Sequence, residues 1–147
     1  MTSIDFYVLS DGPENALELL ACKLSEKALK AGNQIFIQTS DESQTGLLSE
    51  LLWSHKPASF LPHELATELQ QESSATSSPI CIGHKEAPEQ CEQLLINLSQ
   101  KIPPAYARFE RVLELVPPQQ EARAALRENY GHYKDRGYPI KTHEISL

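Results

Sequence analysis

A repeated pattern of cations and one aromatic residue stands in the last quarter of the sequence. Arg123, Arg127, Tyr130 and Lys134 follow one another at intervals of 4, 3 and 4 residues, so they share one face if residues 119–136 are helical. Two arginines one turn apart can hold one carboxylate, and a tyrosine ring one turn further on can pack an apolar side chain. This face suits an acidic peptide with an apolar tip and a free C-terminus. The alternative is an ordinary solvated face of an amphipathic helix.

The distribution of charge agrees with a local anion site. The 147 residues include 13 Lys+Arg and 20 Asp+Glu, a formal net charge of −7. Residues 1–100 hold 5 Lys+Arg and 14 Asp+Glu, whereas residues 101–147 hold 8 and 6. A net acidic chain is a poor candidate for coating nucleic acid, because that affinity comes from neutralising phosphates. We therefore expect contact with nucleic acid only through a partner.

A second candidate site is the apolar connection after the second predicted helix. Trp53 ends that helix, and Phe60, Leu61, Pro62 and His63 follow within ten residues. Large apolar side chains in a connection either form a patch that binds a protein partner or fold back to complete the core. The sequence leaves both interpretations open.

The motifs of catalytic and cofactor sites are missing. The first predicted strand is followed by Ser10-Asp11-Gly12-Pro13-Glu14, which lacks the glycines and free N–H groups of a phosphate loop. The five histidines have no metal-ligand spacing, the three cysteines form no CxxC pair, and no GxSxG motif occurs. We expect no catalytic residues, metal or cofactor, and we favour a binding protein over the alternative of a small nucleotide-handling α/β enzyme.

The elements that must position these residues alternate between strands and helices. Short apolar runs predict strands at residues 4–9, 34–38, 79–83, about 94–98 and 111–116. Helical periodicity predicts helices at 14–31, from Asp41 to about Trp53, at 105–109 and at 119–136. Residues 54–78 are expected to be mainly loop with one short helical turn, and residues 138–147 show no clear pattern.

This order predicts one α/β domain over residues 1–147, with a mostly parallel sheet in a three-layer α/β/α arrangement. We expect this arrangement to be Rossmann-like, without a nucleotide site. No apolar run approaches the roughly 20 residues of a membrane helix, and residues 1–5 show no export signal. We expect a cytoplasmic protein that does not contact membranes.

At the two candidate sites the sequence resembles the chi subunit of bacterial DNA polymerase III holoenzyme. The resemblance runs along the whole chain and is most specific where Trp53 precedes Ser59-Phe60-Leu61-Pro62-His63. The other matching residues are Phe6-Tyr7-Val8-Leu9, Cys22, Gly32, Leu52, Val116-Pro117, Leu126-Arg127-Glu128-Asn129-Tyr130, Tyr133 and Gly137-Tyr138.

The resemblance implies a non-catalytic accessory subunit at the bacterial replication fork. Chi joins the clamp loader through a small partner called psi, and it binds the acidic C-terminal tail of single-stranded-DNA-binding protein, which ends in Ile-Pro-Phe. Carried over to this sequence, the psi contact falls on Phe60, Leu61, Pro62 and His63, with Trp53 either there or in the core. The tail contact falls on Arg123, Arg127 and Tyr130, with Val116 and Thr142 nearby. We add Lys134, which shares their face by its spacing.

Two positions depart from the family pattern at the tail site. Gly131 stands where a lysine often follows the tyrosine, and Arg123 stands where a lysine is familiar. The missing cation at Gly131 predicts weaker tail binding or a larger share for Lys134. A chi-like protein that binds the tail without psi remains a further alternative.

Overall fold

The computed structural model describes residues 2–54, 63–65, 80–89 and 91–146, and for residues 53, 54 and 63–65 it describes the backbone alone. Within these residues seven strands form one sheet in the order β3-β4-β2-β5-β6-β1-β7, and every neighbouring pair is parallel. The strands are β1 (Ser3–Leu9), β2 (Ile35–Gln38), β3 (His63–Leu65), β4 (Ile80–Gly83), β5 (Leu94–Asn97), β6 (Arg111–Val116) and β7 (Ile140–Ile145).

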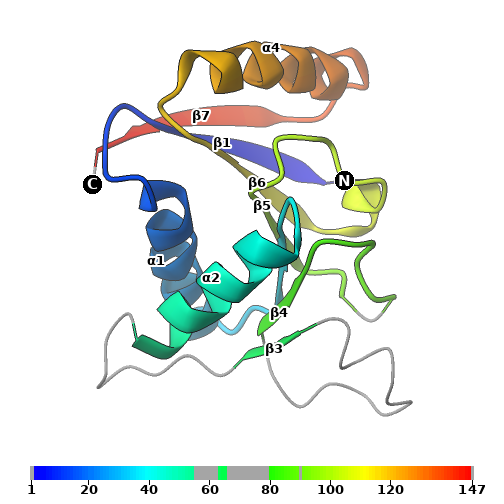
Figure 1. The fold of residues 1–147 in the computed structure, drawn as a ribbon. Helices are drawn as coiled ribbons and strands as arrows, with labels where there is room; N and C mark the ends of the chain where they lie inside the picture. Colours follow the sequence, from blue (N-terminus) through cyan, green and yellow to red (C-terminus); the bar gives the residue numbers. More distant parts are fainter. Residues whose placement is uncertain (1, 55–62, 66–79, 90, 147) are drawn as a thin grey trace.

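Helices lie on both faces of this sheet (Figure 1). Helices α1 (Ala16–Lys30) and α2 (Glu42–Ser54) cover one face, while α4 (Gln120–Asp135) and the short 3-10 helix η2 (Tyr106–Arg108) cover the other. The predicted three-layer α/β/α class is therefore confirmed, and the described strands are all parallel. None of the described helices is long and apolar enough to cross a membrane.

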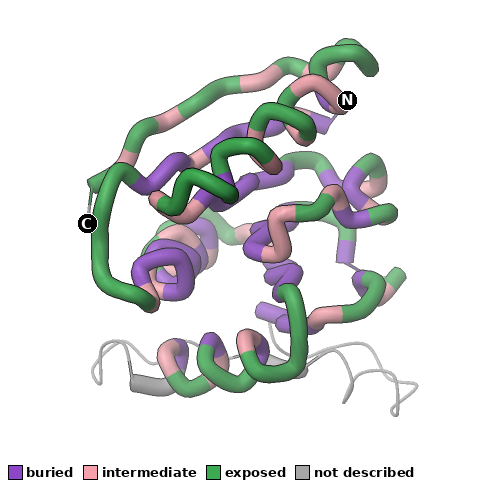
Figure 2. The backbone as a smooth tube through the Cα atoms, turned by 45° about the horizontal axis from the view of Figure 1, so that its top comes forward, coloured by how far each residue is buried: buried purple, intermediate pink, exposed green. Residues whose placement is uncertain are grey.

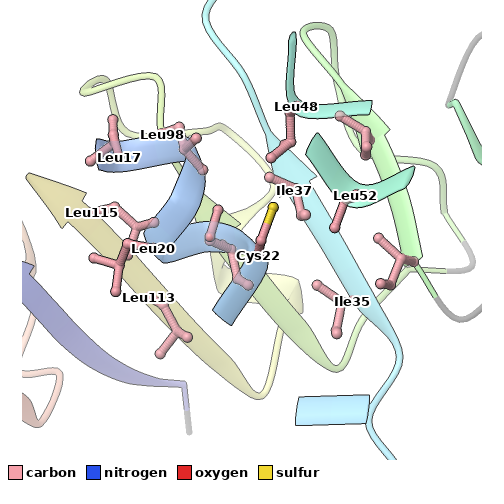
Figure 3. Close-up of a cluster of buried hydrophobic side chains, with 14 of the residues drawn as sticks. Leu17, Leu20, Cys22, Ile35, Ile37, Leu48, Leu52, Leu98, Leu113 and Leu115 are labelled. Atoms are coloured by element: carbon pink, nitrogen blue, oxygen red, sulfur yellow. The ribbon is translucent and has the colours of Figure 1, made fainter. Parts of the chain in front are cut away.

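Two apolar cores separate the layers. Successive strand side chains point to opposite faces, so Ile35 and Ile37 pack under α1 and α2, whereas Phe36 packs on the α4 side. Figure 3 shows the first core, where leucines of α1 and α2 meet the strands around the buried Cys22. Figure 2 shows the inner strands largely buried, whereas β7 and the outer side of α4 are largely exposed. The inner strands β2, β4 and β5 read as nearly continuous apolar runs because both of their faces are covered.

Most predicted elements are confirmed, but the sheet has two edge strands that the sequence did not indicate. Residues 140–145 form β7, where no pattern was recognised, and residues 63–65 form β3, where a loop and a helical turn were expected. The first helix begins at Ala16 instead of residue 14. The predicted helix at 105–109 is a single 3-10 turn.

Candidate protein-binding sites

The connection from β6 to β7 positions the first candidate site. Pro117 and Pro118 end β6, α4 follows from Gln120, and Gly137 turns the chain at a φ of +80° so that it returns as β7. A positive φ is readily adopted by glycine, which explains the residue at this turn. Helix α4 therefore lies across β1 and β7 and runs opposite to them (Figure 1).

The inner face of α4 is fixed by aromatic packing on β1. The Phe6 ring centroid lies 5.7 Å from that of Tyr130 and 6.1 Å from that of Tyr133. Tyr133 is fully buried and Ala122 is buried with it, whereas Tyr130 remains 37% exposed. Tyr130 is thus an apolar ring that is anchored on the sheet and still open to a ligand.

The two flanks of α4 have different neighbours. Asn129 Nδ2 donates to the carbonyl of Gln100 at 3.0 Å, and the His132 ring shares a hydrogen bond of 3.3 Å with the Tyr106 hydroxyl. Both contacts hold one flank against the β5–β6 side of the sheet. The helical period places Arg123, Arg127, Tyr130 and Lys134 on the opposite flank, which faces β7.

Residues of this flank and of β7 together form what we call the α4–β7 surface: Arg123, Arg127, Tyr130, Lys134 and Thr142. Thr142 is exposed and lies opposite Phe6 in the ladder, so its side chain points to the α4 side. The three cations are exposed, and among the described residues they have no ion-pair or hydrogen-bond partner. The cations predicted to share one helix face therefore lie together on the α4–β7 surface, without a partner among the described residues.

Val116, the sixth residue predicted for this site, lies elsewhere. It is only 5% exposed and belongs to the core beneath α4, where it pairs with Val8 of β1. Val116 therefore lies in the core beneath α4. Its contact with a ligand stays a prediction.

A buried carboxyl group lies beneath α4, and sequence reasoning did not identify it. Glu114 of β6 is 2% exposed and accepts hydrogen bonds from Asn97 Nδ2 at 3.0 and 2.8 Å and from the Tyr133 hydroxyl at 2.8 Å. Burial raises the pKa of Glu114 to about 7, although these donors act to lower it. Burial and the adjacent Glu114 also raise the pKa of Tyr133. This network ties the underside of α4 to the sheet.

The second candidate site lies toward the opposite edge of the sheet. His63 begins β3, the strand at the far end of the order from β7, and Trp53 belongs to the last turn of α2. Phe60, Leu61 and Pro62 lie outside the described residues, as do the side chains of Trp53 and His63. Of this candidate site the described backbone therefore places only Trp53 in α2 and His63 in β3, the strand at the opposite edge of the sheet from β7.

Comparison with known proteins places the chain in one family. A family model described as "DNA polymerase III chi subunit, HolC" matches residues 1–141. Three curated proteins named "DNA polymerase III subunit chi" are similar over nearly their whole lengths. The one from Pseudomonas aeruginosa is 36% identical over 145 residues, covering 99% of this chain and 98% of the relative. The one from Haemophilus influenzae is 29% identical, covering 95% of each chain, and the one from Escherichia coli is 26% identical, covering 97% of each. The chain therefore belongs to the DNA polymerase III chi subunit family, the replication accessory subunits that the sequence resembled.

Proposed function

We propose that this chain is a non-catalytic bridge between the clamp loader and the template coated with single-stranded-DNA-binding protein. One edge of the sheet, near β3, receives the psi subunit. The α4–β7 surface at the other edge receives the acidic C-terminal tail of single-stranded-DNA-binding protein. The single observation that carries the tail site is the set of exposed cations, without an ion-pair partner among the described residues, around the exposed ring of Tyr130.

Each part of the tail has a matching group on the α4–β7 surface. Arg123 and Arg127 are one turn apart and can hold the terminal carboxylate through paired hydrogen bonds. The Tyr130 ring offers an apolar contact for the terminal Phe of the tail. Lys134 and the locally positive C-terminal part of the chain favour the acidic residues upstream, while the net charge of −7 disfavours bare DNA. The protein would act beside DNA in the bacterial cytoplasm without competing for it.

Fluorescence anisotropy tests the tail site. The probe is a labelled peptide of three Asp residues followed by Ile-Pro-Phe, prepared with a free carboxylate and as the amide. We expect micromolar binding of the free acid that weakens with salt, and loss of binding for the amide. Arg127→Ala should weaken binding at least tenfold, about 1.4 kcal/mol or more, because the carboxylate loses its partner.

Arg136 supplies a matched control for Arg127. It is an exposed arginine at the C-cap of α4, and its guanidinium donates to the His132 carbonyl on the flank that faces away from β7. Arg136→Ala removes the same charge and should leave tail affinity nearly unchanged. Equal losses for the two variants would show that net charge, not the α4–β7 surface, determines binding.

Co-purification with the psi subunit of the same organism tests the other edge. We expect a stable complex, and Phe60→Ala should weaken it while tail affinity stays unchanged, because β3, which follows the proposed psi contact in sequence, lies at the opposite edge of the sheet from β7. Absence of a complex with wild-type chain, together with normal tail binding, would leave a tail-binding protein that works without psi.

A further inference from the structure

The ladder between β1 and β7 determines which side chains of β7 border the α4–β7 surface. Phe6 and Val8 of β1 belong to the core beneath α4, and they lie opposite Thr142 and Glu144 in the register. Side chains at alternate residues of a strand share one face, so Glu144 points to the α4 side, as Thr142 does. Glu144 is exposed. A carboxylate therefore borders the proposed binding site of a carboxylate.

The level of Glu144 along α4 follows from the packing of Tyr130. The Tyr130 ring packs on the β1 residue that lies opposite Thr142, so these two side chains lie at one level of the surface. Glu144 lies about 6.6 Å further toward the C-terminal end of β7, at about 3.3 Å per strand residue. Because α4 runs opposite to β7 (Figure 1), Arg127 lies about 4.5 Å and Arg123 about 10.5 Å from Tyr130 in the same direction, at about 1.5 Å per helical residue. The level of Glu144 therefore falls between those of the two arginines.

Glu144 has no ion-pair or hydrogen-bond partner among the described residues. Lys141 and His143 alternate with it along β7 and so point to the opposite face of the sheet. Lys134 lies at the other end of the α4–β7 surface, where β7 contributes the apolar Ile140. Of the three cations of this surface, the two arginines are therefore the ones nearest to Glu144.

An exposed carboxylate beside two arginines opposes the binding of an anionic ligand in two ways. Its negative charge lowers the local positive potential that attracts the ligand. Its side chain can also approach the guanidinium groups of the unbound protein and occupy donors that a ligand carboxylate needs. The ligand must then displace Glu144, and its own carboxylate comes to lie beside a like charge.

We propose that Glu144 competes with the terminal carboxylate of the tail for Arg123 and Arg127 and thereby limits the affinity of the α4–β7 surface. This inference rests on the proposed tail-binding function. The competition is confined to the arginine end of the surface, so Lys134 still attracts the acidic residues upstream in the tail. Because all of these groups are exposed, added salt screens the competition as well as the binding itself. The effect of Glu144 is therefore largest at low salt.

Neutralising Glu144 tests the competition. Glu144→Gln keeps the size of the side chain and removes its charge. In the anisotropy assay at low salt, the free-acid Asp-Asp-Asp-Ile-Pro-Phe probe should bind this variant at least threefold more tightly than the wild type, and its affinity should fall more steeply with salt. Unchanged or weaker binding to Glu144→Gln, with normal binding to the wild type, would overturn the competition and leave the tail site intact. Failure of the probe to bind either protein would overturn the tail site itself.

Glu128 supplies the matched control for the change in net charge. It is an exposed glutamate that directly follows Arg127 in α4, so the helical period turns it away from the flank that faces β7. Glu128→Gln should change tail affinity less than twofold, and equal melting temperatures would verify that both variants are folded. Gains of equal size for the two variants would show that net charge, and not the position of Glu144, limits affinity.

A double-mutant cycle tests whether Glu144 acts through the arginines. The gain from Glu144→Gln is measured again in the Arg127→Ala background, where one of the two groups under competition is missing. We expect the gain to shrink to less than twofold. A gain of the same size in both backgrounds would contradict the proposal.

Discussion

Replacing Glu114 by Gln should change how the stability of the protein depends on pH. Glu114 is buried beneath α4, where it accepts hydrogen bonds from Asn97 Nδ2 and the Tyr133 hydroxyl and has no cation among its described contacts. Its pKa is about 7 in the folded state against an ordinary value of 4.5. At about 1.4 kcal/mol per pKa unit, ionisation of Glu114 lowers the free energy of unfolding by about 3 kcal/mol.

The sign follows from proton binding. Between pH 4.5 and pH 7 the folded chain holds the Glu114 proton more tightly than the unfolded chain does, so stability falls as pH rises through this window. The contribution is complete below pH 4.5 and lost above pH 7. Since the sequence pI is about 5.2, measurements should start above it. Between pH 5.5 and 8.5 the wild type should lose about 2 kcal/mol from this group.

Urea unfolding of wild type and Glu114→Gln across that pH range measures the effect. The amide keeps the size of the side chain and an acceptor for Asn97, but it does not ionise. All other titrating groups are shared, so they cancel in the difference between the two proteins. As the pH rises from 5.5 to 8.5, the free energy of unfolding of the variant should increase by about 2 kcal/mol relative to that of the wild type. Parallel pH profiles would refute the assignment of a raised pKa to Glu114.

Four further substitutions, at three positions, give separate predictions. Tyr133→Phe removes one donor to Glu114 and should cost about 1–2 kcal/mol at pH 8.5 but less at pH 5.5, measured by the same unfolding, because donors to a charged acceptor contribute more. Gly131→Ala should raise stability by about 1 kcal/mol, since a Cβ there meets nothing within 4 Å. Gly131→Lys should in addition tighten tail binding a few-fold and steepen its salt dependence in the anisotropy assay. Asp41 caps α2, because its carboxylate accepts a 2.8 Å hydrogen bond from Gln44 N–H. Asp41→Ala removes this cap and should lower the free energy of unfolding by about 1 kcal/mol, with tail affinity unchanged.

The sequence predicted the central strands because they are covered on both faces. Residues 35–37 and 94–96 are uninterrupted apolar runs, and such runs are typical of buried parallel strands. The edge strands gave no such signal. Ile140–Ile145 mixes Lys141, Thr142 and Glu144 with two isoleucines, because its outer side and parts of both faces meet solvent.

The helical part of the candidate site was predictable from the spacing of its residues alone. The 4-3-4 spacing places Arg123, Arg127, Tyr130 and Lys134 on one helix flank whatever the tertiary structure. The burial of Glu114 and its hydrogen bonds to Asn97 and Tyr133 were not predictable, because a glutamate in a strand usually faces solvent. Its burial depends on Asn97, which becomes its neighbour only when β5 and β6 pair in register.

The position of β7 next to β1 also has a consequence for how the chain is made. Ser10 and Ile145, whose main chains are hydrogen-bonded at the end of this pair, are 135 residues apart in sequence. At roughly 5–20 residues per second, the ribosome needs on the order of ten seconds to produce the intervening segment. β1 lacks β6 until residues 111–116 have been made, and it lacks β7 until residues 140–145 have been made. The α4–β7 surface is therefore one of the last parts of the fold to form in biosynthesis.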